Sequence, residues 1–208
     1  VDYGKLYENR FPLLRTAYER SNITANPEYI KFAEENADWL DDYALFMAVK
    51  NKYDGKSYSE WDEDIKTRQT AAVERYTQEC QEEIDFYKFQ QYYFAKQWNE
   101  LKTYANKNGV EIIGDIPIYV ANDSVDVWKN PTLFCLDNNY VSKEVAGVPP
   151  DAFSAEGQLW GNPIYNWAEH EKTNFSWWLS RLERTLELYD IVRIDHFRGF
   201  ASYYSIPA

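Results

Sequence analysis

The second half of the chain limits the possible folds most, because it carries a strand, a long segment, a helix and a second strand in that order. The run Val110-Glu111-Ile112-Ile113-Gly114-Asp115 predicts the first strand, and residues 116–120 continue it in extended form. Residues 130–165, rich in Pro, Gly and aromatic residues, predict a long loop. A helix from about Glu171 leads into a second, buried strand at residues 189–195. This order predicts a βαβ unit and a parallel sheet.

The first half of the chain predicts helices. Asn26-Pro27-Glu28 is typical of a helix start, with Asn as the cap and Pro in the first turn. Apolar residues then follow at helical spacing, at Ile30, Ala33, Ala37, Leu40, Ala44 and Met47. A second helix is expected from about Thr67 to Asn106, ending at Asn108-Gly109. Apolar, largely aromatic residues form a stripe along one face of this helix, and we predict that they belong to the core; they are Tyr87, Phe94, Trp98, Leu101 and Ala105.

Charge and composition exclude several classes of function. The 208 residues include 22 Lys and Arg against 34 Asp and Glu, a formal net charge of −12, which argues against nucleic acid or an anionic membrane as partner. No apolar run approaches the length of a membrane-spanning helix, and no signal peptide is visible. Cys80 and Cys135 are lone thiols, which favours a reducing, cytoplasmic location. The two histidines predict no metal site, and His170 is expected at the surface.

Two charged residues lie on one face of the second predicted strand. Side chains alternate along a strand, so Arg193 and Asp195 point to the same side, roughly 6.5 Å apart. An arginine at that distance favours the ionised form of the aspartate and lowers its pKa. Spacing alone leaves two interpretations open, a structural ion pair at a strand end or a catalytic carboxylate at the carboxyl end of a parallel strand. Asp115 repeats the arrangement at the first strand.

The long loop favours the catalytic interpretation. Residues 147–153 and 157–163 combine rigid Pro turns, Gly, an acid, amides and aromatic rings. Sugars stack their C–H faces on aromatic rings, and their hydroxyls hydrogen-bond to carboxylates and amides. The loop therefore predicts a carbohydrate ligand.

Several long motifs together resemble one family. Residues 113–120 (Ile-Gly-Asp-Ile-Pro-Ile-Tyr-Val) with Asp123-Ser124, residues 147–167, and residues 192–200 (Val-Arg-Ile-Asp-His-Phe-Arg-Gly-Phe) resemble the 4-α-glucanotransferases, also called amylomaltases or disproportionating enzymes. These form family 77 of the glycoside hydrolases, in the α-amylase clan. Residues 39–46 and Gln97-Trp98 in the helical half extend the resemblance over essentially the whole chain.

The resemblance implies a fold and a set of site residues. The expected fold is α/β, a partial (β/α)₈ TIM barrel of which this chain supplies strands 3 and 4, with a large helical insertion. The expected parts are a helical subdomain at residues 1–108 and a barrel segment at residues 109–208, with its active-site loop at 130–165. By motif, Asp195 matches the catalytic nucleophile. The residues expected to bind substrate are Arg193, Asp115, Asp151, His196, Trp160 and Asn162. No metal or cofactor is implied.

The implied activity is transfer of α-1,4-glucan segments between malto-oligosaccharides by a retaining double displacement. Two further acids that the family uses, a Glu after the fifth barrel strand and an Asp after the seventh, have no matching motif in residues 1–208. We therefore expect a fragment that is inactive alone and that self-associates, most simply as a twofold dimer. Two alternatives stay open: an α-amylase-type glucan hydrolase, and a non-catalytic glucan-binding module.

Overall fold

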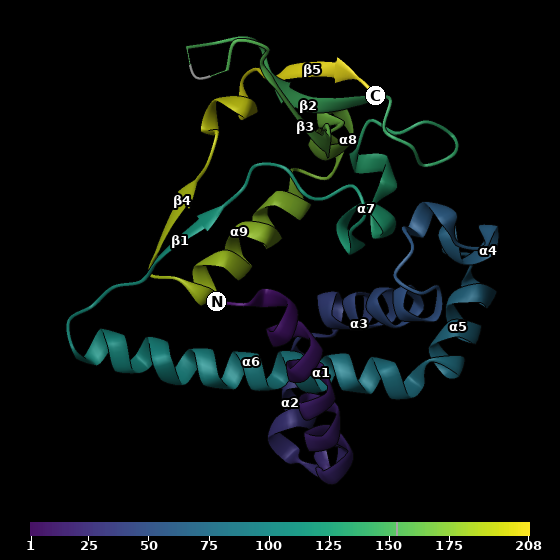
Figure 1. The fold of residues 1–208 in the computed structure, drawn as a ribbon, viewed down its shortest axis with the longest axis vertical. Coiled ribbons are helices and arrows are strands. Elements are labelled where there is room, and N and C mark those ends of the chain that lie inside the picture. The colour runs from purple at the N-terminus through teal and green to yellow at the C-terminus, as the bar shows by residue number, and fades with distance from the viewer. Residues whose placement is uncertain (153) are drawn as a thin grey trace. The chain divides into compact units, whose positions relative to one another are not determined.

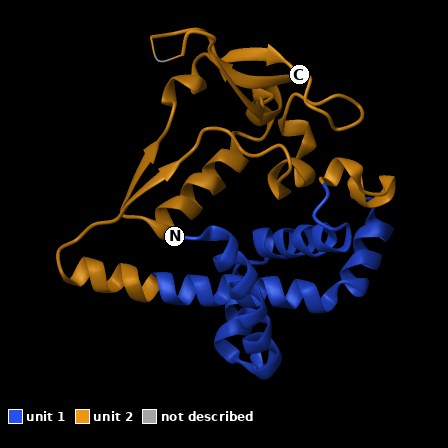
Figure 2. Ribbon diagram, in the orientation of Figure 1, with its two compact units in different colours: residues 1–56, 69–98 blue, residues 57–68, 99–208 orange. Residues whose placement is uncertain are grey.

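The computed structural model describes residues 1–152 and 154–208, so Phe153 of the predicted sugar-binding loop lies outside the described residues. The described chain forms two compact units, shown in Figure 2. Unit 1 comprises residues 1–56 and 69–98, and unit 2 comprises residues 57–68 and 99–208. Compared with the division expected at residue 108, the short segment 57–68 groups with the second half of the chain.

Unit 1 is helical. Its elements are α1 (Tyr3–Arg20), α2 (Pro27–Glu35), α3 (Ala37–Lys52), α5 (Thr70–Glu79) and the first part of α6 (Gln81–Lys107), with a 3₁₀ turn at Ile23–Ala25 (Figure 1). One core cluster joins the 3₁₀ turn, α2 and α6 through buried, mostly aromatic residues, which are Ile23, Tyr29, Phe86, Phe89 and Tyr92. Aromatic rings in such clusters add edge-to-face contacts to the free energy gained by burial.

Helix starts were predicted better than helix lengths. Asn26 caps α2 as expected, because its side chain accepts the backbone N–H groups of Glu28 and Tyr29. The single helix expected after Asn26 is divided at Asn36, and Ile30, placed on its buried face, is exposed. The second expected helix is likewise divided at Cys80, between α5 and α6.

The aromatic stripe predicted to be the core of α6 is only partly buried. Tyr87 is buried, but Phe94 and Leu101 are exposed. The buried face of α6 instead comprises Ile84, Phe86, Tyr87, Phe89 and Tyr92, all in the first half of the helix. The prediction was wrong for the second half because periodicity identifies an apolar face without showing whether another element packs on it.

Unit 2 contains the strands. β1 (Ile113–Ile116) and β4 (Ile191–Ile194) pair in parallel, and α9 (Ser176–Leu188) lies beside them in Figure 1. The predicted parallel βαβ arrangement is therefore confirmed. The register places Asp115 opposite Arg193. The start of the pair is fixed by Asp190, whose carboxylate accepts the N–H of Ile112 at 2.8 Å and so has a lowered pKa.

Close packing at this sheet explains why residue 114 is a glycine. A Cβ on Gly114 would lie 2.0 Å from a ring carbon of Tyr189, so only glycine lets the Tyr189 ring approach β1. The other face of the sheet is less covered than expected. Ile113 and Ile191 are exposed, and the prediction that β4 is a buried strand was wrong. Among residues 1–152 and 154–208 this sheet has two strands, so each strand has one unpaired edge.

The segment predicted as a loop, residues 130–165, contains two strands of a second sheet. β2 (Glu144–Val148) pairs antiparallel with β3 (Gln158–Pro163) and with β5 (Tyr204–Pro207), in the order β3-β2-β5. The remaining elements of unit 2 are short, namely α4 (Glu63–Lys66), α7 (Val125–Lys129), α8 (Trp167–Lys172) and 3₁₀ turns at Tyr58–Glu60, Pro131–Leu133 and Phe197–Phe200. α7 begins after Ser124, whose side chain caps it by accepting the backbone N–H of Val127. Over the described residues, no helix combines the length and hydropathy required to cross a membrane.

His170 is buried, contrary to the expected surface position. Its imidazole lies among the rings of Tyr165, Trp167 and Trp177, with centroids 5.3–5.8 Å away. Nε2 lies 3.2 Å from the carbonyl oxygen of Leu133, so Nε2 carries the proton and donates it. Burial lowers the pKa of His170 below its ordinary value, and the bond to Leu133 opposes this shift only in part.

The depressed pKa of His170 predicts loss of stability in acid. Below the unfolded-state pKa of about 6.5, the unfolded chain binds a proton at this residue that the folded chain does not, so the free energy of unfolding falls as pH falls. The limit is about 1.4 kcal/mol per pH unit. When the pH is lowered from 7.5 to 5.5, the free energy of unfolding measured in urea should fall more for the wild type than for His170→Phe. Parallel losses in the two proteins would contradict this.

Candidate active site

Three charged side chains meet at the carboxyl ends of β1 and β4. Arg193 donates from Nε to Asp115 Oδ1 at 3.1 Å and from Nη2 to Asp115 Oδ2 at 2.6 Å. The same Nη2 lies 3.5 Å from Asp195 Oδ1. These bonds raise the pKa of Arg193, chiefly through Asp115. Arg193 therefore holds Asp115 in a two-point fork and reaches Asp195 with its outer nitrogen.

The pair anticipated from spacing was Arg193 with Asp195, and the structure shows that Asp115 is the nearer partner. Parallel register explains the difference, because Asp115 lies directly across from Arg193 whereas Asp195 lies two residues along the same strand. All three side chains are open to solvent, with exposed fractions of 53% for Asp115, 65% for Arg193 and 66% for Asp195. Exposed ion pairs contribute little to stability, so this cluster does not explain the fold.

The backbone turns sharply directly after Asp195. His196 has φ of +51°, a left-handed conformation that costs energy for a residue with a side chain. The turn directs the imidazole of His196 to the indole of Trp160, with ring centroids 5.1 Å apart and planes at 86°. Trp160 also contacts the ring of Tyr119 at 6.3 Å, and its Nε1–H donates to Gln158 Oε1. An aromatic surface thus lies beside the residue that follows Asp195.

Asn162 contacts the segment that leaves β1. Its Nδ2 donates to the carbonyl oxygen of Val120 at 2.8 Å. The structure therefore brings together six of the seven predicted residues in two groups, Asp115, Arg193 and Asp195 on the strand ends, and His196, Trp160 and Asn162 beside them.

Asp151 lies elsewhere, in the turn between β2 and β3. Its carboxylate accepts the backbone N–H of Ser154 at 2.8 Å, and its own N–H donates to the carbonyl of Ser154. This places Asp151 on the turn of the second sheet rather than at the ends of β1 and β4.

Residues 117–120, the segment after β1, are held by two residues that the sequence analysis missed. Arg181 of α9 donates to the carbonyl oxygens of Pro117 at 2.7 Å and Ile118 at 3.1 Å. Tyr165 donates its hydroxyl to the same Ile118 oxygen at 2.6 Å. Burial lowers the pKa of Arg181. A signal existed, because Arg181 follows the buried Trp178 by three residues and so lies on the apolar face of its helix.

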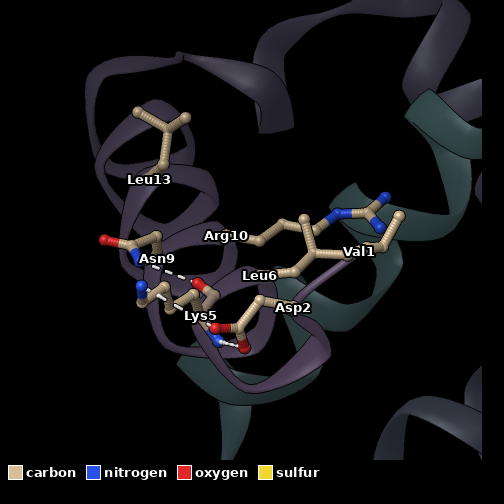
Figure 3. Close-up of a pocket in the computed structure, with 7 residues that line it drawn as sticks. All are labelled: Val1, Asp2, Lys5, Leu6, Asn9, Arg10 and Leu13. Atoms are coloured by element: carbon tan, nitrogen blue, oxygen red, sulfur yellow. Dashed lines mark hydrogen bonds and ion pairs between the residues drawn. The ribbon is translucent and has the colours of Figure 1, made fainter.

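A shallow hollow also lies along the first turns of α1 (Figure 3). It is lined by Val1, Asp2, Lys5, Leu6, Asn9, Arg10 and Leu13, none of them a predicted site residue. Its polar contacts serve the helix itself, since Asp2 accepts the backbone N–H of Lys5 as a cap and Asn9 donates to the carbonyl of Lys5. Within the described residues, no group of three or more His, Cys, Asp or Glu side chains is placed to hold a metal ion.

Replacement of Arg181 should destabilise the protein more than replacement of Arg184 on the same helix. Arg181→Met leaves the Pro117 oxygen without its side-chain donor and weakens the hold on Ile118, at a cost of about 1–3 kcal/mol. Arg184→Met removes a surface pair with Glu187 and should cost about 0.5 kcal/mol or less. Equilibrium urea unfolding measures both, and equal losses would contradict the role given to Arg181.

Comparison with known proteins identifies the family. The family model described as 4-alpha-glucanotransferase matches residues 1–208. The chain is 50% identical over 207 residues to a 4-alpha-glucanotransferase of Clostridium butyricum and 46% identical over 212 residues to one of Thermus thermophilus. It covers 99% and 100% of its own length in these comparisons but 42% of each relative. The chain thus spans less than half the length of these curated relatives.

A solved structure gives the same result. An amylomaltase from Streptococcus agalactiae in complex with acarbose superposes with a TM-score of 0.93 at 45% identity, covering 100% of this chain and 42% of that one. The α/β fold of the chain is therefore that of the matching part of an amylomaltase. Taken with the family model over its full length, this shows that the chain belongs to the 4-α-glucanotransferase family, family 77 of the glycoside hydrolases.

Proposed function

We propose that this chain is the part of a 4-α-glucanotransferase that holds the nucleophile, and that the nucleophile is Asp195. The observation that carries the proposal is the position of the Asp195 carboxylate, at the end of β4 and 3.5 Å from an arginine that is itself fixed by Asp115. The carboxyl end of a parallel barrel strand is where barrel enzymes place catalytic groups, and a carboxylate there can act as a nucleophile. The substrates are α-1,4-glucans and malto-oligosaccharides, with no nucleic acid or membrane partner, and the location is cytoplasmic.

The proposed reaction is a double displacement with retention. An oxygen of Asp195 forms a bond to the anomeric carbon as the glycosidic bond breaks, and the leaving oxygen takes a proton from a second carboxyl group. A hydroxyl of another glucan chain then attacks the same carbon, the bond between that carbon and Asp195 breaks to restore the carboxylate, and the proton of the hydroxyl returns to the second carboxyl group. Trp160 offers a ring face for a sugar, and Asp115 and Arg193 keep Asp195 in place.

The second carboxyl group is proposed to lie outside residues 1–208. We assign β1 and β4 to barrel strands 3 and 4, and most of unit 1 to a helical insertion in the barrel. The general acid is expected after the fifth strand, which follows β4 in such a barrel. General acid catalysis contributes about 10²–10⁴-fold, so residues 1–208 alone should not transfer glucan segments.

Asp195→Asn tests the proposed nucleophile in the polypeptide encoded by the complete gene. With maltotriose, the wild type should give both shorter and longer sugars, whereas Asp195→Asn should lower transfer by several orders of magnitude. The melting temperature should stay unchanged because the Asp195 side chain is mostly exposed. Glu187→Gln, also an exposed carboxylate in an ion pair, serves as the control and should keep full activity.

Near-wild-type turnover of Asp195→Asn would show that another residue is the nucleophile. Formation of shorter sugars without longer ones would favour a glucan hydrolase. Binding of maltotriose without any product would favour a non-catalytic glucan-binding module.

Self-association of residues 1–208 is proposed from the apolar residues exposed in unit 2, among them Ile113, Leu179, Ile191 and Phe197. Light scattering at micromolar concentration should give twice the 24.7 kDa of one chain. Ile191→Lys, on the open face of β4, should reduce the mass to that of a monomer. Leu13→Lys, at an exposed position of α1, should not change it. A monodisperse wild-type monomer would refute the dimer.

A further inference from the structure

β3 is interrupted by a bulge that coincides with two predicted site residues. Gly147 pairs with Leu159 and Val145 pairs with Pro163, so four steps along β3 match two along β2. Between these two pairs lie Trp160, Gly161 and Asn162 on β3, against Ala146 alone on β2. Gly161 has φ of +76°, a conformation that glycine adopts without strain. Bulges of this kind bend a strand and redirect a side chain, and they occur often beside active sites.

The bulge directs Trp160 to His196. The two rings lie at 5.1 Å, edge to face, and Trp160 is 37% exposed, so one part of its indole stays open to a ligand. His196 follows Asp195 directly and has its own left-handed backbone. Two unusual backbone conformations, at Gly161 and at His196, therefore produce one contact between two rings.

Both sides of this contact rest on residues 117–120. Asn162, the last bulge residue, donates its amide to the Val120 carbonyl at 2.8 Å. The His196 turn packs on the same segment, because a Cβ on Gly199 would lie 2.7 Å from Ile118 Cδ1 and 3.0 Å from His196 Cδ2. Arg181 and Tyr165 fix the carbonyl oxygen of Ile118 by donating hydrogen bonds to it. Residues 117–120 thus connect β1, the bulge and the turn after Asp195.

We propose that Gly161 and Asn162 are positioning residues, which set the Trp160 ring against His196 and so determine where a sugar ring of the glucan lies relative to Asp195. The inference rests on the proposed function. It changes the role of Asn162, which was expected to bind substrate, because its amide nitrogen is engaged by a backbone carbonyl. Gly161 acts through its backbone, since no heavy atom other than those of residues 160–162 lies within 4 Å of the site of a Cβ.

The test uses two pairs of matched variants. Asn162→Asp keeps the shape of the side chain but removes the N–H that Val120 accepts, and Asn108→Asp is its control, because Asn108 also donates at 2.8 Å to a backbone carbonyl, that of Tyr104. Gly161→Ala places a side chain at positive φ without a clash. Its control is Gly109→Ala, at φ of +74° and also in open space. Gly161→Asn is the rescue variant, because Asn tolerates this conformation.

The first readout is the NMR spectrum of histidine ring protons in residues 1–208. The chain has two histidines, and His170→Phe assigns the signals of His196. Trp160→Leu gives the position of these signals without the indole. Asn162→Asp and Gly161→Ala should shift them towards that position, whereas Gly161→Asn and the two controls should stay near the wild type. Unchanged His196 signals in both Asn162→Asp and Gly161→Ala would overturn the proposal.

The second readout is kcat/KM for maltotriose in the polypeptide encoded by the complete gene. A shift of the Trp160 ring by about 1 Å should lower kcat/KM by about 10–100-fold in Asn162→Asp and Gly161→Ala. In Gly161→Asn, kcat/KM should return towards the wild-type value. Shifted His196 signals with unchanged kcat/KM would overturn the link to substrate placement. An inactive wild type would refute the proposed function, and the His196 signals would still decide whether Gly161 and Asn162 position Trp160.

Discussion

The fork between Arg193 and Asp115 is the interaction on which the site depends. Two parallel strands place these residues opposite each other, which lets the guanidinium of Arg193 bind the carboxylate of Asp115 at two points. Nη2 of Arg193, which donates one N–H to Asp115 in the fork, has a second N–H left, and Asp195 Oδ1 lies 3.5 Å from this nitrogen. The strand register, rather than any single residue, therefore determines where the proposed nucleophile lies. Asp190 and Gly114 serve the same register, one by accepting the Ile112 N–H and the other by admitting Tyr189.

Local signals in the sequence predicted local structure well. The Asn26 cap was identified because a cap depends on atoms within three residues of itself. The parallel pairing followed from the order of elements and short-range patterns. The motifs around Asp115 and Asp195 identified the residues that Arg193 joins, but not which of these two partners is the nearer, because cross-strand register is set by the fold and is absent from residue spacing.

The features that were missed all depend on contacts between distant segments. β2 pairs with β5 over as many as 63 positions, as between Glu144 and Pro207, so the Pro- and Gly-rich sequence around β2 and β3 indicated only a loop. His170 is buried by rings that converge on Tyr165, a centre that no periodicity indicates. Phe94 and Leu101 have the spacing of a core face and are exposed, because an apolar stripe does not show what packs on it.

The geometry separates two requirements of glycosyl transfer, orientation of charge and exclusion of water. The described residues meet the first, since Asp115, Arg193, the His196 turn and the β3 bulge are fixed by hydrogen bonds and close packing. They do not meet the second, because the side chains of Asp115, Arg193 and Asp195 are each more than half exposed. In water the field of Arg193 is strongly screened, and an exposed glycosyl intermediate would be open to hydrolysis. The proposed transfer to a sugar hydroxyl therefore requires a cover over this strand edge, and the relatives have more than half of their length outside the region matched by this chain.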